Sequence, residues 1–368
     1  MANSQNRIFG LDVLRASAIL MVVSSHVLWI YPKSNNFIAL VLELFGFWGV
    51  ELFFVLSGFL IGSILYQSYV SDSFTLKAVF HFLKRRWFRT LPNYYLVLIA
   101  NIFIAFFIGY QVDNIGLYFV FLQNFIHKSP VFFPESWSLS VEEFAYLLLP
   151  FALFFGTFGF VKNKSKRFLI IVFLLLIVFF FAKVIFNATC TISNLTDWNS
   201  NLKSIVIYRI DAILVGVLTV WIRFNFEAFW KKYKELFLFL GIGIFFFLLF
   251  GISSSNLRIE QSPFFWNVLY LPLTSLGFAF IFPIFSEWKL SNSFLKNPIV
   301  FVSKISYAIY LIHYSVILQL MKYFVDTTVL TSHQRHFFTI LYLMITFLMA
   351  YILYRFYEKP MMNLRDKI

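Results

Sequence analysis

The chain has 368 residues, of which 60% are hydrophobic and 13% are charged, and phenylalanine occurs 53 times. Because soluble domains have roughly 45–50% apolar and about 25% charged residues, this composition excludes an ordinary soluble protein and predicts an all-α polytopic membrane protein. The formal net charge of +13 does not call for a nucleic acid as partner, since cytoplasmic loops between apolar spans collect Lys and Arg.

Ten segments are long and apolar enough to cross a bilayer, at about 20 residues each. They lie near 8–31, 37–66, 91–110, 137–160, 168–187, 203–223, 235–252, 263–285, 299–323 and 336–356. An eleventh apolar patch, 115–126, reaches only about 18 Å as a helix. We therefore predict ten spans in a single integral-membrane domain, 1–368.

The distribution of basic residues predicts the orientation of these spans. If 115–126 does not span and the N-terminus is cytoplasmic, 20 of the 30 basic residues fall on the inner side. Five fall outside (Lys33, Lys128, Lys203, Arg258 and Arg335), and five lie within spans (Arg15, Lys183, Arg209, Lys304 and Lys322). Both termini are therefore expected in the cytoplasm. Segment 111–136 would then lie outside, as a re-entrant or interfacial element.

The first span carries Arg15 and His26, eleven residues apart. Almost three helical turns separate them, so both lie on one face, about 16 Å apart along the axis. Arg15 could simply reach the interface or pair with Asp12, one turn earlier, and His26 could be a hydrogen-bonded packing residue. An ionisable group within the membrane is nevertheless a candidate functional residue, and imidazole suits proton transfer near neutral pH.

The second span contains Glu51 in its outer half, followed by Gly58 and Gly62. The glycines are typical of close helix packing, whereas a carboxylate at this depth is harder to explain by packing.

Arg86 and Arg89 follow in "KRRWFR" and share one helical face. The cluster either anchors the chain on anionic lipid or clamps a phosphate-bearing cytosolic ligand. Pro92 is expected to mark the junction with the third span.

The fourth span opens with "WSLSVEE", residues 137–143. Ser140 and Glu143 have the spacing of a capping box, which makes Glu143 a helix-start residue. Glu142 points about 100° away from Glu143 and is not used by that box, so it is the better candidate for a functional residue. Trp137 could lie at the interface, and Ser138 is a further polar candidate.

Two later spans also carry polar residues. Arg209 and Asp211 are two apart, so they do not face each other and each should find a partner on another helix. Tyr310 and His313 lie one turn apart in the outer half of the ninth span, where packing or gating is the simpler role. No P-loop, GxGxxG, HExxH or GxSxG motif occurs, and no Cys/His metal-binding spacing either.

Together these stretches resemble the membrane acyltransferase 3 family. The resemblance runs over nearly the whole chain in six fragments: "GLDVLRASAILMVVSSHV", "GVELFFVLSGFLIG", "KRRWFR", "WSLSVEEFAYLLLP", "YRIDAILVGVL" and "ISYAIYLIHY". It implies that His26 is the catalytic histidine, that Arg15 is its partner on the same helix, and that Arg86 and Arg89 bind the phosphates of acyl-CoA. The chain departs from the family pattern at Glu51, where Asp is common, and at Phe144–Ala145, which replace Gln-Phe.

The resemblance further implies that the protein is an acyltransferase of a bacterial inner membrane and that it transfers acyl groups other than aminoacyl groups. Its donor substrate would be acetyl-CoA or another acyl-CoA, with no metal, and its acceptor a hydroxyl of an extracytoplasmic glycan or glycolipid. His26 would act as general base or as a transient acyl carrier, and Glu142 or Glu51 could orient the imidazole or bind sugar hydroxyls from the outer side. Glu142 would then be the better candidate for the acceptor side of the site, and Trp137 could stack on a sugar. Many relatives carry a fused extracytoplasmic esterase-like domain. Since only 357–368 follow the last span, we expect the chain to act alone or with a separate partner.

Two other classes fit the polar residues. A proton-coupled secondary transporter would also use intramembrane acids and histidines, although no inverted halves are visible. A receptor or scaffold would use them only for packing, and substitutions of His26, Arg86 and Arg89 would then change stability alone.

Overall fold

The computed structural model describes residues 7–31, 36–71, 74–110, 112–128, 132–289 and 294–365. Within these ranges the chain folds into helices and turns without a β-strand, which confirms the all-α prediction. The longer helices are α1 (Phe9–His26), α2 (Phe37–Val70), α3 (Leu76–Ile108), α5 (Ser136–Gly156), α6 (Lys164–Thr189), α8 (Ile210–Asn225), α10 (Lys234–Phe246), α12 (Tyr270–Glu287), α13 (Lys296–Ile312) and α15 (Ser332–Leu353).

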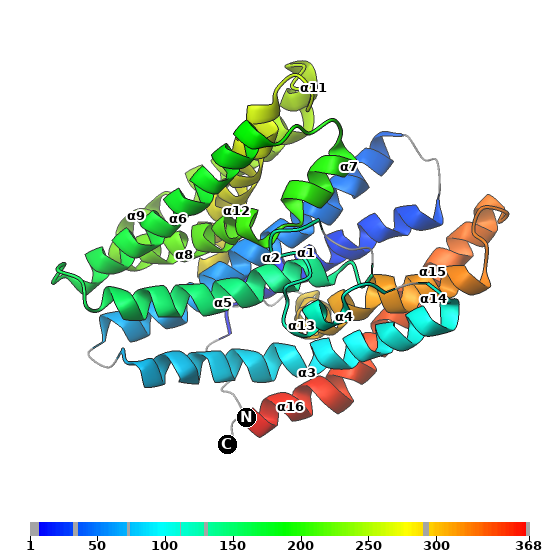
Figure 1. Ribbon diagram of the computed structural model, residues 1–368, viewed down its shortest axis with the longest axis horizontal. Helices are drawn as coiled ribbons and strands as arrows, with labels where there is room; N and C mark the ends of the chain where they lie inside the picture. Colours follow the sequence, from blue (N-terminus) through cyan, green and yellow to red (C-terminus); the bar gives the residue numbers. More distant parts are fainter. Residues whose placement is uncertain are drawn as a thin grey trace.

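Shorter helical pieces extend or connect these elements (Figure 1). They are η2 (Val27–Ile30), α4 (Ile115–Phe119), α7 (Leu195–Trp198), η3 (Asn199–Lys203), η4 (Val206–Tyr208), α9 (Glu227–Lys232), η5 (Phe247–Gly251), α11 (Ile252–Ser254), η6 (Phe265–Leu269), η7 (His313–Leu318), α14 (Gln319–Phe324), η8 (Tyr354–Glu358) and α16 (Lys359–Arg365).

The number of helices able to span a membrane agrees with the prediction. Across the described ranges, nine helices are long and apolar enough, and a tenth span results if Leu195–Lys203 and Val206–Asn225 are taken together. That pair bends by 94° at the break between Lys203 and Val206, so the sixth predicted span, 203–223, corresponds to its second part, Val206–Asn225. The patch 115–126 forms only the five-residue helix α4, too short to cross.

Glycines allow the central helices to approach closely. A Cβ at Gly58 of α2 would collide with the backbone carbonyl of Ile213 on α8, and one at Gly216 of α8 would collide with the carbonyl of Val55 on α2. A Cβ at Gly62 would lie 3.0 Å from the Cα of Val217. The packing role predicted for Gly58 and Gly62 is therefore confirmed: backbones meet where side chains are absent.

The third helix begins earlier than predicted. Thr75 caps α3, accepting a hydrogen bond from the backbone N–H of Ala78, and the helix continues through Pro92 to Ile108. Reading Pro92 as a junction was wrong. A proline within a membrane helix is tolerated where neighbouring groups compensate for its missing N–H. Arg86 and Arg89 consequently belong to the same rigid helix as the membrane-spanning part.

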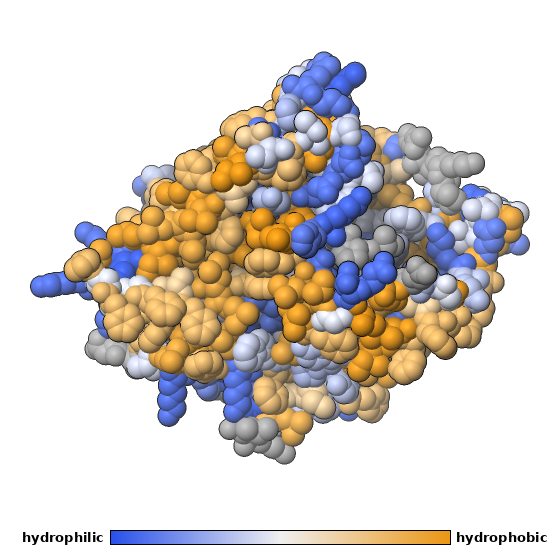
Figure 2. Space-filling view, viewed as in Figure 1, coloured by the Kyte–Doolittle hydropathy of each residue, from blue (hydrophilic) through white to orange (hydrophobic). Residues whose placement is uncertain are grey.

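The surface is largely apolar between polar ends. On the face shown in Figure 2, hydrophobic residues cover α5 and α6, whereas hydrophilic residues gather around α7 and α11. Many large apolar side chains are exposed, for example Phe106 at 88% and Phe103 at 69% on α3. Such exposure would be unfavourable in water and suits contact with lipid.

The irregular segment before α5 packs against the helices instead of projecting outward. Gln123 Nε2 donates to Ser140 Oγ at 2.8 Å, and Asn124 Nδ2 donates to the carbonyl oxygen of Ser204 at 2.6 Å. Tyr94 of α3 donates to the carbonyl oxygen of Tyr118 at 2.8 Å. Asn124 thus satisfies a backbone carbonyl outside the helices. The other two hydrogen bonds join the segment to α5 and α3.

Candidate active site

Two histidines from distant parts of the chain lie against each other. His26 ends α1, and His313 begins η7, the π-helical turn that continues α13. Their rings pack edge to face with centroids 4.7 Å apart, and His313 Nε2 lies 3.3 Å from His26 Nδ1. The structure thus brings together two residues that the sequence singled out separately.

Backbone carbonyls assign the tautomers of this pair. His313 Nδ1 lies 2.8 Å from the carbonyl oxygen of Tyr310, and His26 Nδ1 lies 2.9 Å from that of Val22. Since a carbonyl oxygen can only accept, each Nδ1 carries the hydrogen in the neutral ring. His313 Nε2 is then an acceptor for His26 Nδ1–H. His26 Nε2 keeps its lone pair and has no hydrogen-bond partner in the described part of the chain.

The His26 ring borders a wide cavity of about 1210 Å³, which we call the histidine cavity. Trp29, Trp137 and Tyr314 contribute aromatic walls, and Lys203 lies 6.0 Å from the centre of the Trp137 ring. Aromatic faces with interspersed polar groups are the usual lining of a site for an amphipathic ligand. Trp137, one of the candidates from the sequence, thus lines the same cavity as His26.

A second, smaller cavity of about 100 Å³, the central cavity, contains the predicted cationic residues. Arg15, Arg86 and Arg89 line it together with Glu142. Glu142, the candidate for the acceptor side, thus borders the arginines and does not line the histidine cavity. Its Oε2 accepts a hydrogen bond from Tyr146 at 3.1 Å.

Two residues form the partition between these two cavities. Tyr310 and Val50 line both of them. The Tyr310 hydroxyl lies 2.5 Å from Ser138 Oγ, so a hydrogen bond joins α13 and α5 at the partition. The two sequence candidates Tyr310 and Ser138 thus meet at the boundary.

A third cavity of about 290 Å³, the arginine cavity, adjoins the central one. Arg86 and Arg89 line both. Helix α2 passes all three cavities, with Ile64 at the arginine cavity, Ser57 at the central cavity and Phe47 at the histidine cavity. The three cavities therefore follow one another along the same helix, with cationic residues at one end and the histidine pair at the other.

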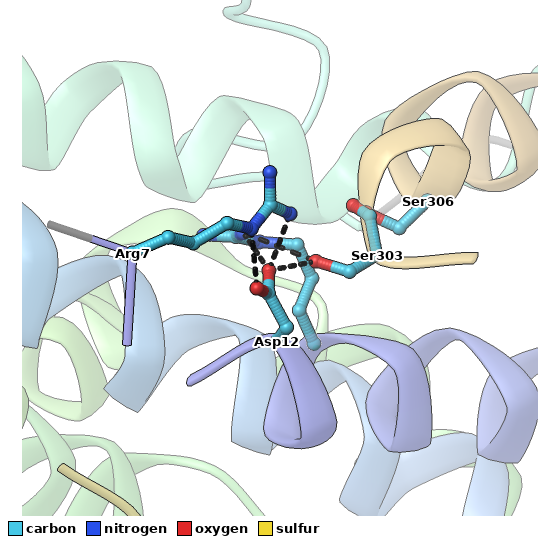
Figure 3. A network of polar contacts seen from close by, with 5 residues as sticks. Arg7, Asp12, Ser303 and Ser306 are labelled. Atoms are coloured by element: carbon cyan, nitrogen blue, oxygen red, sulfur yellow. Dashed lines mark hydrogen bonds and ion pairs between the residues drawn. The ribbon is translucent and has the colours of Figure 1, made fainter. Parts of the chain in front are cut away.

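Arg15 is held at the edge of a polar network between α1 and α13. Its Nη1 lies 3.7 Å from Asp12 Oδ1 and 3.3 Å from Ser303 Oγ, which confirms the expected proximity of Arg15 and Asp12. Asp12 also accepts from Arg7 at 2.6 Å and from Ser303 at 2.6 Å, and Figure 3 shows Asp12 and Ser303 pointing toward each other. The network fixes the start of α1 against α13.

The capping-box prediction for Glu143 was wrong. Helix α5 begins at Ser136, so Ser140 lies in its second turn and donates to the carbonyl oxygen of Ser136. Glu143 is buried, and its Oε1 accepts from Thr90 Oγ1 of α3 at 2.8 Å. Its role is to join two helices, because α5 begins at Ser136, five residues before the start that the Ser–Glu spacing indicates.

Glu51, Arg209 and Asp211 form ion pairs between helices and do not line the three cavities, although Arg209 packs on Phe47 and Phe54, which do. Arg209 of α8 pairs with Glu51 of α2, whose other oxygen accepts from Ser275 of α12. Asp211 pairs with Lys183 of α6. All five side chains are buried. The prediction that Arg209 and Asp211 have separate partners on other helices is confirmed. In the part of the chain that the structure describes, Glu51 forms no hydrogen bond or ion pair with either histidine.

The sequence reading missed Glu135 and Tyr314. Glu135 precedes α5 and lines the histidine cavity; its Oε1 accepts from the backbone N–H of Ser315 at 2.7 Å. Burial raises the pKa of Glu135 to about 7, against the opposing effect of that N–H. The Tyr314 ring lies 4.8 Å from the His26 ring. Neither residue forms a local motif, so only the packing of η7 against α1 and α5 identifies them.

No group of three or more His, Cys, Asp or Glu side chains that could hold a metal ion occurs in the described ranges.

Comparison with known proteins agrees with the resemblance in the sequence. A family model described as an acyltransferase domain matches residues 8–355. O-acetyltransferase OatA of Staphylococcus aureus (strain NCTC 8325 / PS 47) is 27% identical over 378 residues, which cover 95% of this chain and 56% of the relative. Peptidoglycan O-acetyltransferase OatA of Listeria monocytogenes serovar 1/2a is 28% identical over 387 residues, which cover 97% of this chain and 56% of the relative.

The chain thus spans about half the length of the curated relatives it matches. No solved structure matches it. Because the family model covers nearly all of the sequence, the chain belongs to the membrane acyltransferase 3 family.

Proposed function

We propose that this protein is a membrane O-acyltransferase that moves an acyl group, acetyl in the simplest case, from cytoplasmic acyl-CoA to a hydroxyl of an extracytoplasmic glycan. The observation that carries the proposal is the row of cavities along α2, with arginines at one end and a base-competent histidine at the other. The relatives named as O-acetyltransferases, one of them acting on peptidoglycan, support both the reaction and the class of acceptor.

The donor would bind with its phosphates at Arg86 and Arg89. These two guanidinium groups border both the arginine cavity and the central cavity, and guanidinium binds phosphate through paired hydrogen bonds. The narrow central cavity would hold the arm that carries the thioester. Arg15, which also lines this cavity, would add positive charge near the sulfur that leaves.

The thioester must pass the partition to reach His26. Tyr310 and Ser138 form the hydrogen bond at this point, so that bond is expected to open when the donor arm enters. The acceptor would occupy the histidine cavity from the opposite side, with its sugar ring against Trp137.

His26 Nε2 would act as general base. The acceptor hydroxyl oxygen attacks the thioester carbonyl carbon, and Nε2 takes the hydroxyl proton. The carbon–sulfur bond then breaks, the new ester is released, and the leaving thiolate takes the proton from the imidazolium. His313 Nε2 accepts from His26 Nδ1–H, and this hydrogen bond strengthens when His26 carries the charge.

Proteoliposomes containing the protein test the proposal. They are given acetyl-CoA labelled in the acetyl group and a peptidoglycan fragment, and label transferred to the glycan is measured. Wild-type protein is expected to transfer label, and His26→Ala to lose transfer while keeping donor binding. Equal rates in the two proteins would refute the mechanism.

The same preparation distinguishes the two alternatives. Uptake of a solute that does not depend on coenzyme A would indicate a proton-coupled transporter. Substitution of Arg86 and Arg89 separates an enzyme from a scaffold, because a scaffold would change only in stability.

A further inference from the structure

Glu135 contacts the chain on both sides of His313. Its side-chain Oε1 accepts from the backbone N–H of Ser315 at 2.7 Å, two residues after His313. Its backbone carbonyl oxygen accepts from the Tyr310 hydroxyl at 3.2 Å, three residues before His313. The segment that precedes α5 therefore holds the chain around η7 at two points, and His313 lies between them.

The side-chain contact falls where the regular helix is interrupted. Ile312, the last residue of α13, has φ −114° and ψ −15°, and the chain continues as the π-helical turn η7. An α-helix has values of about −63° and −42°. A new helical turn leaves its first N–H groups without intrahelical partners, and a side-chain carboxylate is a good acceptor for them. Glu135 thus supplies an acceptor to η7 from a distant segment of the chain.

The position of η7 sets the hydrogen bond of the histidine pair. His313 Nε2 lies 3.3 Å from His26 Nδ1, slightly beyond the usual length of roughly 2.7–3.2 Å, so a small displacement of η7 would break this contact. In the described ranges, Glu135 has hydrogen bonds with Ser138, Tyr310 and Ser315 and with neither histidine. Any influence of its side chain on His26 therefore passes through η7 and His313.

We propose that Glu135 is a positioning residue for acyl transfer: its ionised carboxylate holds η7 through the Ser315 N–H and thereby keeps His313 Nε2 at His26 Nδ1. The inference rests on the proposed function and deepens it, since it adds a residue that acts on the histidine pair from outside. A carboxylate accepts from N–H more strongly than a neutral carboxyl or carboxamide group does. The ionised form is therefore the one that fixes His313.

The burial of Glu135 makes this charge state depend on pH. Its side chain lines the histidine cavity and is buried, which raises the pKa of Glu135 to about 7 against the opposing effect of the Ser315 N–H. Above this pH the carboxylate is ionised and holds η7, and below it the neutral group holds η7 less strongly. Four tyrosines of neighbouring elements face the carboxyl group: Tyr110 after α3, Tyr310 of α13, Tyr314 of η7 and Tyr342 of α15.

A double-variant comparison tests whether Glu135 acts through His313. Initial rates of acetyl transfer are measured in proteoliposomes with equal amounts of folded wild type, Glu135→Gln, His313→Phe and the double variant. Glu135→Gln, which keeps the shape of the side chain, is expected to lower kcat by up to about tenfold, as for one hydrogen bond to a charged group. It should lower kcat no further in the His313→Phe background. Losses that multiply in the double variant would overturn the proposal.

The ratio of the wild-type kcat to the Glu135→Gln kcat, measured against pH, is the second readout. Other titratable side chains line the same cavity and are present in both proteins, so their titration cancels in the ratio: Tyr31, Glu43, His26, Lys203, His313 and Lys322. The ratio should be largest well above about pH 7 and approach one well below it, because the wild-type carboxyl group then becomes neutral like the carboxamide. A ratio that is independent of pH would contradict the role of the ionised carboxylate.

The two Michaelis constants distinguish positioning from binding. Glu135 does not line the central or the arginine cavity, so Glu135→Gln should leave KM for acetyl-CoA unchanged. A higher KM for the glycan acceptor at unchanged kcat would make Glu135 a residue that binds the glycan, and the proposal would be wrong.

Glu260→Gln is the matched control, because Glu260 is an exposed carboxylate that lines none of the three cavities. It should keep the wild-type kcat and pH profile. Glu135→Asp, which retains the charge on a side chain one methylene shorter, replaces Glu135→Gln in the double-variant comparison if the latter does not fold. Wild type that transfers no label would contradict the proposed function itself, whereas multiplying losses in an active enzyme would contradict only the role of Glu135.

Discussion

Replacing His313 tests how the histidine pair works. His313→Phe keeps a ring of similar shape against His26 but removes the nitrogen that accepts from His26 Nδ1–H. His26 would then take the acceptor proton without a partner for its developing charge. The backbone carbonyl of Val22 would still hold the Nδ1–H, so the tautomer of His26 is retained.

The size of the effect follows from this one contact. A hydrogen bond to a charged group contributes about 1.5–3 kcal/mol, and each 1.4 kcal/mol changes a rate about tenfold. The Nε2–Nδ1 separation of 3.3 Å is slightly longer than an ordinary N–H hydrogen bond, which is roughly 2.7–3.2 Å. We therefore expect the lower end of the range, a loss of about tenfold in kcat.

Initial rates of acetyl transfer in proteoliposomes measure this effect, with acetyl-CoA and acceptor varied separately. His313→Phe should lower kcat and leave KM for acetyl-CoA unchanged, since His313 does not line the central or the arginine cavity. His313→Gln, which retains an acceptor, should recover part of the rate. An unchanged kcat in His313→Phe, or no difference between the two variants at equal folded protein, would refute the reasoning.

Three further substitutions test the packing and the acceptor side. Arg209→Met should lower the free energy of unfolding by about 3–5 kcal/mol, because it leaves the Glu51 carboxylate buried without its ion partner. Thermal unfolding in detergent should show that the double variant Arg209→Met/Glu51→Leu recovers stability. An equal loss of stability in the single and the double variant would argue against the ion pair. Gly58→Ala should lower the unfolding temperature, because the added Cβ would collide with the α8 backbone. Gly243→Ala is the control, because a Cβ there meets open space and should leave the unfolding temperature unchanged. Similar changes in unfolding temperature for the two variants would contradict the close packing of α2 against α8. Trp137→Ala should raise KM for the glycan acceptor about tenfold, as for one lost stacking contact, with KM for acetyl-CoA unchanged; a rise in the donor KM instead would place Trp137 on the donor side.

The start of α5 illustrates how local signals misled the sequence reading. The Ser140–Glu143 spacing predicts a cap, but the helix begins at Ser136 and Glu143 bonds to Thr90, 53 residues earlier in the chain. Pro92 likewise predicts a helix boundary, but α3 continues through it. Cap and proline signals describe local preference, and long-range packing overrides them when a neighbouring helix satisfies the same groups.

The sequence by itself determined that the chain is helical and embedded in a membrane, and nearly where each span lies. The physical reason is that hydrocarbon offers no hydrogen bonds, so each apolar segment must satisfy its backbone internally and can be recognised alone. It also indicated which polar residues are unusual, among them His26, Arg86, Arg89 and His313.

Only the tertiary structure decided which of these residues act together. His26 and His313 are 287 residues apart in the sequence, and Glu51 and Arg209 are 158 residues apart. At such separations the spacing in the sequence does not indicate which residues are in contact. The helix-packing geometry that places one pair beside a cavity and buries the other depends on side chains throughout the bundle. The structure therefore places Glu51 in a buried ion pair, Glu142 beside the arginines of the central cavity, and Tyr310 and Val50 where the central and histidine cavities meet.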